Sequence, residues 1–189
     1  MRIISGEFRG RRLKAPPGEG TRPMLDRVRE AIFSTAAPWL EGARVLDLFA
    51  GSGSLGFEAL SRGAKEVRFV EMDKRVTKVI EENAATLGVD RGLYQVRLGN
   101  ALDRQHWFPE GTDLVFLDPP FPLVKDRQAR ARMMSWLGDL LNEGLAPEGL
   151  VVLHVPRDLL GEADLPECDS AERTYGGQSI WYLQAPDGD

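Results

Sequence analysis

The chain changes its hydrophobic pattern at residue 44. From there on, short apolar runs alternate with longer segments whose apolar positions recur every three or four residues. Short apolar runs are typical of buried strands, and the longer periodic segments are typical of amphipathic helices. The predicted strands are Arg44–Leu48, Glu66–Glu71, Tyr94–Leu98, Asp113–Asp118 and Leu150–Val155. The predicted helices between them are Ser54–Ser61, Asp73–Leu87 and Gln128–Leu141.

This alternation predicts an α/β fold of the Rossmann-like type, with a mostly parallel twisted sheet and helices on both faces. Two further strand candidates, Ser170–Tyr175 and Ser179–Leu183, flank Gly176 and Gly177 near the end of the chain. Glycine pairs between such segments are typical of tight turns between antiparallel strands. We therefore expect a C-terminal antiparallel hairpin at one edge of the sheet.

The N-terminal region predicts a small basic β-hairpin in front of the main domain. Its expected elements are two short strands and a helix, at Arg2–Ser5, Arg11–Lys14 and Arg27–Ala37. Asp26 is the expected N-cap of that helix, and Pro38 its expected stop. The predicted organisation is a basic arm over residues 1–25 followed by one compact domain over residues 26–189.

Composition narrows the class of protein. The 189 residues carry a net charge of −5, yet residues 1–29 hold eight basic and only three acidic side chains. An acidic body with a basic arm favours local contact with phosphates over a general coating of nucleic acid. No apolar run approaches the ~20 residues of a membrane span, and the N-terminus lacks the apolar segment of a signal peptide. We expect a cytoplasmic monomer that does not bind a membrane.

The two histidines and the single cysteine give little indication of metal binding or catalysis. His106 and His154 are far apart in the sequence, and Cys168 is the single cysteine. No metal site is therefore expected, and an intramolecular disulfide is excluded. With no partner acid or nucleophile indicated near them, both histidines are predicted to be structural or exposed rather than catalytic.

The stretch that ends the fourth predicted strand is the most informative. Asp118 is followed by two prolines and Phe121. Each proline fixes its own φ and the first restricts the residue before it, so the turn is rigid. It would present the Asp118 carboxylate, the Pro119 carbonyl and the Phe121 ring together, which suits a planar group carrying an NH₂. Taken alone, the stretch favours an ordinary Asp-Pro turn, and only the other motifs of the chain favour a binding site.

A glycine loop follows the first predicted strand. Gly51 to Gly56 match the dinucleotide pattern G-x-G-x-x-G, and Glu71 ends the next strand. Asp47 lies on the strand itself, where a pyrophosphate would meet a negative charge. An acid there favours a ligand with a positive end, such as S-adenosylmethionine, with Glu71 accepting from the ribose hydroxyls.

The third predicted strand is followed by Asn100, whose amide offers a donor and an acceptor to an adenine edge. Alone, Asn100 could be a turn former, and Glu71 a plain helix-entry acid. Polar groups at the carboxyl ends of successive strands favour one shared ligand site. The predicted cofactor-binding residues are Asp47, Phe49, Ala50, Gly51, Ser52, Gly53, Glu71, Met72, Asn100, Ala101 and Asp118.

These motifs together resemble the successive motifs of class I S-adenosylmethionine-dependent methyltransferases. The acid-Pro-Pro-aromatic form resembles that of enzymes that methylate exocyclic or amide nitrogens. The N-terminal stretches Met1–Gly6, Arg9–Arg11, Arg22–Pro23 and Asp26–Phe33 are similar to the RsmD family of 16S ribosomal RNA guanine-N2 methyltransferases. The chain departs from that family's usual pattern at Met24, Leu25 and Ser34.

The resemblance implies S-adenosylmethionine as cofactor and 16S rRNA or a small-subunit assembly particle as partner. It implies Asp118, Pro119 and Phe121 as catalytic residues. The basic residues expected to contact RNA phosphates are Arg9, Arg11, Arg12, Arg22, Arg27, Arg127 and Arg130. Three alternatives stay open: an adenine-N6 DNA methyltransferase, a NAD-dependent oxidoreductase and a non-catalytic RNA-binding factor.

Overall fold

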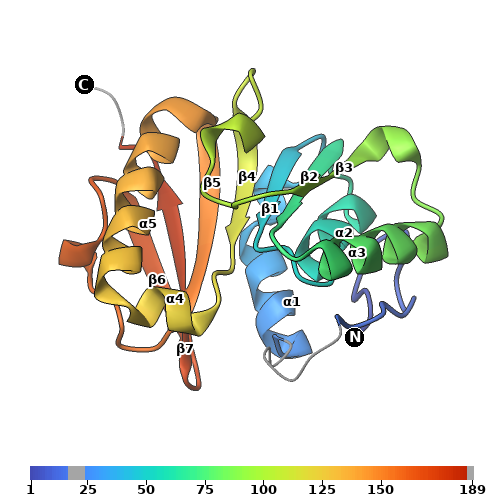
Figure 1. Cartoon of the computed structure of the whole chain (residues 1–189), viewed down its shortest axis with the longest axis horizontal. Coiled ribbons are helices and arrows are strands. Elements are labelled where there is room, and N and C mark those ends of the chain that lie inside the picture. Colours follow the sequence, from blue (N-terminus) through green and yellow to red (C-terminus); the bar gives the residue numbers. More distant parts are fainter. Residues whose placement is uncertain (17–23, 187–189) are drawn as a thin grey trace.

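The computed structural model of the chain describes residues 1–16 and 24–186. A mixed sheet with the strand order β3-β2-β1-β4-β5-β7-β6 forms its centre (Figure 1). β1 to β5 run parallel, β7 is antiparallel to β5, and β6 is antiparallel to β7. The strands are β1 Arg44–Leu48, β2 Glu66–Glu71, β3 Tyr94–Leu98, β4 Thr112–Leu117, β5 Leu145–Pro156, β6 Asp169–Tyr175 and β7 Gln178–Gln184. The predicted parallel sheet with a C-terminal antiparallel hairpin is confirmed.

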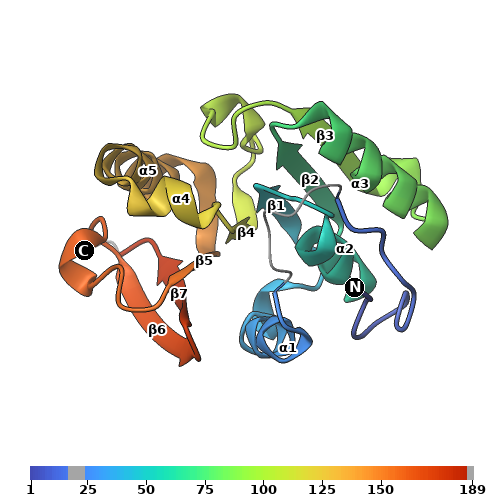
Figure 2. The same ribbon diagram turned by 60° about the horizontal axis from the view of Figure 1, so that its bottom comes forward.

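Helices cover both faces of this sheet (Figure 2). The α-helices are α1 Asp26–Thr35, α2 Ser54–Ser61, α3 Lys74–Leu87, α4 Phe121–Lys125 and α5 Arg127–Asp139. The short helical turns are η1 Ala37–Trp39, η2 Arg91–Leu93, η3 Arg104–His106, η4 Leu140–Gly144 and η5 Glu162–Asp164. The buried side chains of α1, α2 and α3 join one core cluster, and those of α4 and α5 join a second on the opposite face.

Side chains alternate between these two cores along the central parallel strands. On β4, Leu114 and Phe116 belong to the core under α1 to α3, whereas Val115 and Leu117 belong to the core under α4 and α5. This period of two is the reason that both faces of the strand are apolar. A continuous apolar run therefore marks a strand buried on both sides, as the sequence pattern predicted.

The first helix differs from its prediction at both ends. Its N-cap is Leu25, not Asp26, and no side chain caps the helix. The Asp26 carboxylate instead contacts two arginines, Arg2 at 3.5 Å and the buried Arg29 at 3.0 Å. α1 ends at Thr35, and Pro38 lies inside the following turn η1, where it does not stop the helix.

The second half of the sheet also extends beyond its prediction. β5 begins at Leu145, five residues before the expected start at Leu150. The pairing of β4 with β5 shifts between Thr112 and Leu114, so the extra residues form an irregularity in the ladder, with Glu148 at φ 60°. Such bulges continue a strand through residues whose types indicate a turn.

The structure contains a short helix that the sequence pattern did not predict. α4 begins at Phe121 and carries Pro122 in its first turn. Proline is well tolerated there, because the first N–H groups of a helix have no intrahelical partner. The acid-Pro-Pro-aromatic turn therefore leads directly into a helix.

The N-terminal segment folds back on itself, with one antiparallel bridge between Arg2 and Arg12 in place of two strands. Side chains of α2 and α3 satisfy several of its backbone groups. The buried Glu58 carboxylate accepts from the N–H groups of Ile4 at 2.7 Å and Ser5 at 3.0 Å. These bonds attach the segment to the sheet domain. Its two arms pair with each other through the N–H groups of Ile3 and Leu13, which donate to Arg11 O and Met1 O at 3.0 Å, so the predicted N-terminal hairpin is present in a short form.

Within residues 1–16 and 24–186, no helix combines the length and apolar character needed to cross a membrane. The same residues contain no cluster of three or more acidic, histidine or cysteine side chains suited to a metal ion.

Candidate active site

The predicted site residues meet where the strand order reverses. β1 has β2 on one side and β4 on the other, and the loops that leave their carboxyl ends diverge to opposite faces. Backbone bonds continue the ladder past the strand ends: Ala50 N–H donates to Val70 O at 3.1 Å, and Asp118 N–H to Leu48 O at 3.4 Å. Open α/β sheets bind their ligands at such a point.

The glycine loop after β1 has an unusual backbone. Phe49 has φ 59°, and Gly51 and Gly53 have φ 56° and 77°. Left-handed geometry is ordinary for glycine and rare for phenylalanine, so Phe49 is strained. A Cβ on Gly56 would lie 2.3 Å from the Phe69 ring, so this glycine permits close packing of α2 on β2.

Asp47 lies beneath this loop, with 1% of its surface exposed. Its Oδ2 accepts from the Gly56 N–H at 2.8 Å. Burial raises the pKa of Asp47 well above its usual value, and the charges of Asp118 and Glu71 add to the rise, although the Gly56 bond opposes it. A cationic ligand group beside the ionised carboxylate would offset this penalty.

Glu71 points toward the glycine loop. Its Oε2 accepts from the Gly51 N–H at 3.1 Å, and its Oε1 from the N–H groups of Met72 at 2.8 Å and Asp73 at 3.0 Å. Asp73 is the residue that caps α3, accepting from the Arg75 N–H at 2.7 Å. Asp73, not Glu71, is therefore the N-cap of α3, and Glu71 connects the glycine loop to the residues that lead into that helix.

The loop after β3 has the hydrogen bonds of a turn. Asn100 Oδ1 accepts from the Leu102 N–H at 3.1 Å, and Nδ2 contacts Asp103 at 3.4 Å. The Asn100 side chain is exposed, whereas Ala101 is buried. Nearby, Met72 and Leu98 leave apolar side chains 75% and 55% exposed at the carboxyl ends of β2 and β3. Leu98 was not predicted as a site residue, because as part of a strand it indicated only core packing.

The side chain of Ser52, a predicted cofactor residue, is directed toward the N-terminal segment. It is 5% exposed, and its hydroxyl faces the Met1 sulfur at 3.8 Å. Its carbonyl accepts from the Asn83 amide at 2.9 Å, and the same amide contacts Lys14 of the N-terminal segment. Asn83 therefore links the glycine loop to the N-terminal segment, a role that the sequence did not indicate.

Asp118 has a partner that the sequence did not reveal. His154 Nδ1 lies 2.7 Å from Asp118 Oδ1, and the Phe121 and His154 rings lie 5.5 Å apart in an edge-to-face arrangement. The His154 side chain is 7% exposed and that of Asp118 34% exposed. The expectation that no acid lies near His154 is wrong. The sequence could not show it, because the two residues meet only through the pairing of β4 with β5.

His106 has a different environment. Its ring is buried, burial lowers its pKa, and its backbone carbonyl accepts from the buried Arg68 at 2.7 Å. These contacts help to fold the loop before β4. No contact among the described residues joins the ring to Asp47, Glu71 or Asp118.

The predicted RNA-contacting arginines fall into two groups. Arg9, Arg12, Arg27 and Arg127 are exposed. The guanidinium groups of Arg11 and Arg130 each donate a hydrogen bond to a backbone carbonyl, Arg11 to that of Leu87 and Arg130 to that of Val124. Arg22 lies outside the described residues.

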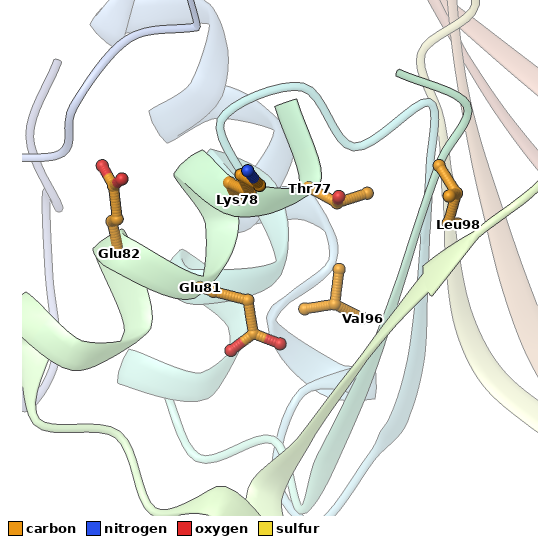
Figure 3. Close-up of a pocket in the computed structure, with 6 residues that line it drawn as sticks. All are labelled: Thr77, Lys78, Glu81, Glu82, Val96 and Leu98. Carbon is orange, nitrogen blue, oxygen red and sulfur yellow. The ribbon is translucent and has the colours of Figure 1, made fainter. Parts of the chain in front are cut away.

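A separate groove lies on the outer edge of the sheet. It has a volume of about 390 Å³ and is lined by α3 and β3, with Thr77, Lys78, Glu81 and Glu82 facing Val96 and Leu98 (Figure 3). The groove includes Leu98 but neither Asp47 nor Asp118. It is therefore not the predicted site, although the two share the end of β3.

Comparison with known proteins adds the family. The model of the family described as "Conserved hypothetical protein 95" matches residues 1–184. Ribosomal RNA small subunit methyltransferase D of Haemophilus influenzae is 40% identical over 84% of this chain and 80% of its own length. The Escherichia coli K12 protein of the same name is 44% identical over 74% of this chain and 70% of its own.

The chain belongs to the RsmD family. Solved structures agree with this assignment. The Escherichia coli protein yhhF superimposes with a TM-score of 0.79 at 35% identity, over 97% of both chains. The Thermus thermophilus protein TTHA0928 gives a TM-score of 0.77 at 28% identity, over 97% of this chain and 99% of its own. The resemblance to this family that the sequence motifs showed is therefore confirmed.

Proposed function

We propose that this RsmD-family protein transfers a methyl group from S-adenosylmethionine to the N2 amine of a guanine in small-subunit ribosomal RNA. The observation that carries the proposal is the position of Asp118. It lies on a rigid turn at the carboxyl end of β4, close to Asp47 of β1 and Glu71 of β2. Two relatives of the chain, from Haemophilus influenzae and Escherichia coli, are named ribosomal RNA small subunit methyltransferase D, which agrees with this proposal.

The residues present fit S-adenosylmethionine better than a dinucleotide. Asp118 and Glu71 are both close enough to raise the pKa of the buried Asp47. A pyrophosphate would add negative charge to this group of acids, whereas a ligand with amino and sulfonium groups would neutralise part of it. This charge disfavours the NAD-dependent alternative. When bound, S-adenosylmethionine supplies an electrophilic methyl group.

The proposed cofactor-binding residues surround this group of acids. Glu71 would accept from the ribose at Oε2, which holds one backbone bond, and not at Oε1, which already accepts two. Asn100 would reach the adenine edge, and Met72 would offer an exposed apolar side chain to its face. The other proposed residues are Asp47, Phe49, Ala50, Gly51, Ser52, Gly53, Ala101 and Asp118.

The exocyclic amine of guanine is a poor nucleophile, because its lone pair is delocalised into the ring. Asp118 and the Pro119 carbonyl would accept its two N–H groups and orient the lone pair. The same acceptors stabilise the positive charge that develops on nitrogen. Asp118 would take the proton itself or orient the amine while water takes it. Phe121 would stack on the base, which must leave its own stack to enter the site.

Exposed arginines would hold the RNA backbone. Arg9, Arg12, Arg27 and Arg127 are exposed, and the proposed set also includes Arg11, Arg22 and Arg130. Contacts of this kind position the substrate without reading its sequence. We propose that the protein acts as a monomer in the cytoplasm, on free 16S rRNA or on an assembling small subunit.

The proposal is tested with Asp118→Ala. Transfer of labelled methyl groups to unmethylated small ribosomal subunits should fall by at least about 100-fold, the usual loss for a proton-accepting residue. S-adenosylmethionine binding, measured by calorimetry, should weaken much less than turnover, because Asp47 and Glu71 remain in the site. Glu110→Ala is the matched control, since this acid is exposed on a loop before β4. Full activity of Asp118→Ala would contradict the assigned role.

The identity of the product separates guanine from adenine as target. Nucleosides from the methylated RNA, analysed by mass spectrometry, should contain N2-methylguanosine. N6-methyladenosine in the product would instead support the adenine-methylating alternative.

A further inference from the structure

His154 reaches the proposed active site from the strand beside Asp118. β4 and β5 pair in parallel with Leu117 opposite Leu153, so the next residue of each strand, Asp118 and His154, are neighbours across the sheet. On its other side, His154 pairs with Ile180 of β7. An imidazole held between two paired strands has a fixed position, which makes it a suitable anchor for a group on a turn.

We propose that His154 is a positioning residue for Asp118, an inference that rests on the proposed function. An ionised carboxylate can only accept hydrogen bonds, so Nδ1 of the imidazole carries the proton in this pair. The 2.7 Å contact uses Oδ1 of Asp118. Oδ2 has no hydrogen bond within the described part of the chain and is left to accept from the substrate amine.

The burial of the ring argues against a role in packing alone. His154 is 6% exposed, and its Nε2 has no hydrogen-bond partner among the described residues. Among the described residues, Asp118 is therefore the hydrogen-bond partner of the His154 side chain. Burying an imidazole with one nitrogen unpaired is unfavourable, and an apolar residue would avoid it. What the imidazole adds at this position is its bond to the carboxylate.

The same ring also contacts the proposed stacking residue. The centroids of Phe121 and His154 are 5.5 Å apart with an interplanar angle of 67°. Edge-to-face contacts of this kind favour one relative orientation of two rings. One buried side chain therefore orients both the acceptor of the amine and the aromatic surface on which the base would stack.

Fixing the carboxylate has a kinetic consequence. Without His154, Asp118 can rotate about its side-chain bonds, and its free oxygen is less often directed at the amine. Small misplacements of a reacting group lower the rate far more than they lower substrate binding. Loss of His154 should therefore lower kcat more than it changes KM. Cofactor contacts made by Glu71 and the glycine loop do not involve His154.

Three substitutions test this inference. His154→Leu should lower kcat by about 10- to 100-fold while the KM for S-adenosylmethionine changes by less than about two-fold. His154→Asn places an amide N–H where Nδ1 donates and should recover most of the lost kcat. His154→Gln extends its amide toward the position of Nε2 and should not. Val152→Ala, also buried and on the same face of β5, is the matched control for lost packing.

The outcomes are distinct. Normal kcat in His154→Leu, or equal losses in the Asn and Gln variants, would overturn the positioning role. If His154→Leu fails to fold, the comparison of Asn with Gln still decides. Absence of methyl transfer by the wild-type protein would refute the proposed function itself, whereas full activity of Asp118→Ala would refute the role of Asp118 and, with it, this inference. An inactive Asp118→Ala together with a fully active His154→Leu would refute this inference alone.

Discussion

Asp47 shows how a single side chain can be unfavourable for the fold and useful for the site. It is buried, its carboxylate has one backbone donor, and its pKa is raised because burial disfavours the charged form. Below the pKa that Asp47 has in the unfolded chain, its carboxyl group is protonated in both states and does not destabilise the folded one. As the pH rises through the raised pKa of the folded state, stability is lost.

Asp47→Asn should therefore stabilise the protein free of cofactor. The amide oxygen can still accept from the Gly56 N–H, and no charge is buried. The gain should be small near pH 4, close to the usual pKa of an unfolded Asp, and larger at pH 8, as followed by thermal unfolding. For a domain of this size, about 1 kcal/mol corresponds to roughly 2–4 °C in Tm.

The same variant should bind S-adenosylmethionine more weakly, so that added cofactor raises its Tm less than that of the wild type. A variant that loses stability equally at both pH values, or gains none at pH 8, would contradict the account of Asp47. Stabilisation together with weaker binding is the pattern expected of a functional residue.

At the scale of elements, the glycine loop depends on how closely α2 approaches β2. Gly56 lies in the first turn of α2, where an added Cβ would be 2.3 Å from the Phe69 ring and 2.7 Å from Val67. Both neighbours are buried side chains of β2 and have little room to move. The helix, and with it the loop that precedes it, is positioned by the absence of a side chain.

Gly56→Ala should lower the free energy of unfolding by about 1–3 kcal/mol, the usual cost of overpacking a core. Cofactor affinity should fall as well, because moving α2 also moves the loop. Gly177→Ala is a suitable control, since nothing lies near its added Cβ in the final hairpin. Urea unfolding of both variants measures the difference. Equal stability of the two would show that α2 can shift without penalty.

At the scale of the whole molecule, basic side chains and the acidic body are separated. The N-terminal segment is attached through Glu58 and Asn83, and it leaves Arg9 and Arg12 exposed. The site acids lie at the carboxyl ends of the central strands. Such a separation allows a negatively charged RNA to approach along the basic segment while its target base enters an acidic site.

Replacing Arg9 and Arg12 together by Gln should lower the affinity for RNA and make that affinity less dependent on salt concentration. Each lost phosphate contact lowers the slope of log K against log salt concentration by about 0.7 to 0.9, so the pair should lower it by about 1.4 to 1.8. Arg91→Gln is the control, because Arg91 is paired with Glu81 at 2.7 Å. An unchanged slope in the double variant would exclude these two arginines from the interface.

The sequence alone determined the strands β1 to β3 and the helix α2, because apolar runs bounded by glycine leave few other local structures. It also determined which polar residues follow those strands, and hence that they share one edge of the sheet. Chain order and the parallel sheet suffice for that conclusion, since successive strands of such a sheet end on the same side.

Tertiary structure decided what depends on residues distant in the sequence. Arg2 and Arg29 engage Asp26, so it does not cap α1. Glu58 of α2 accepts from the N–H groups of Ile4 and Ser5, which attaches the N-terminal segment to the sheet domain. His154 meets Asp118 only because β4 and β5 pair in one register, and register is set by packing across the whole sheet. A sequence pattern reports which residues belong to a strand, but only the assembled sheet determines which side chains become neighbours.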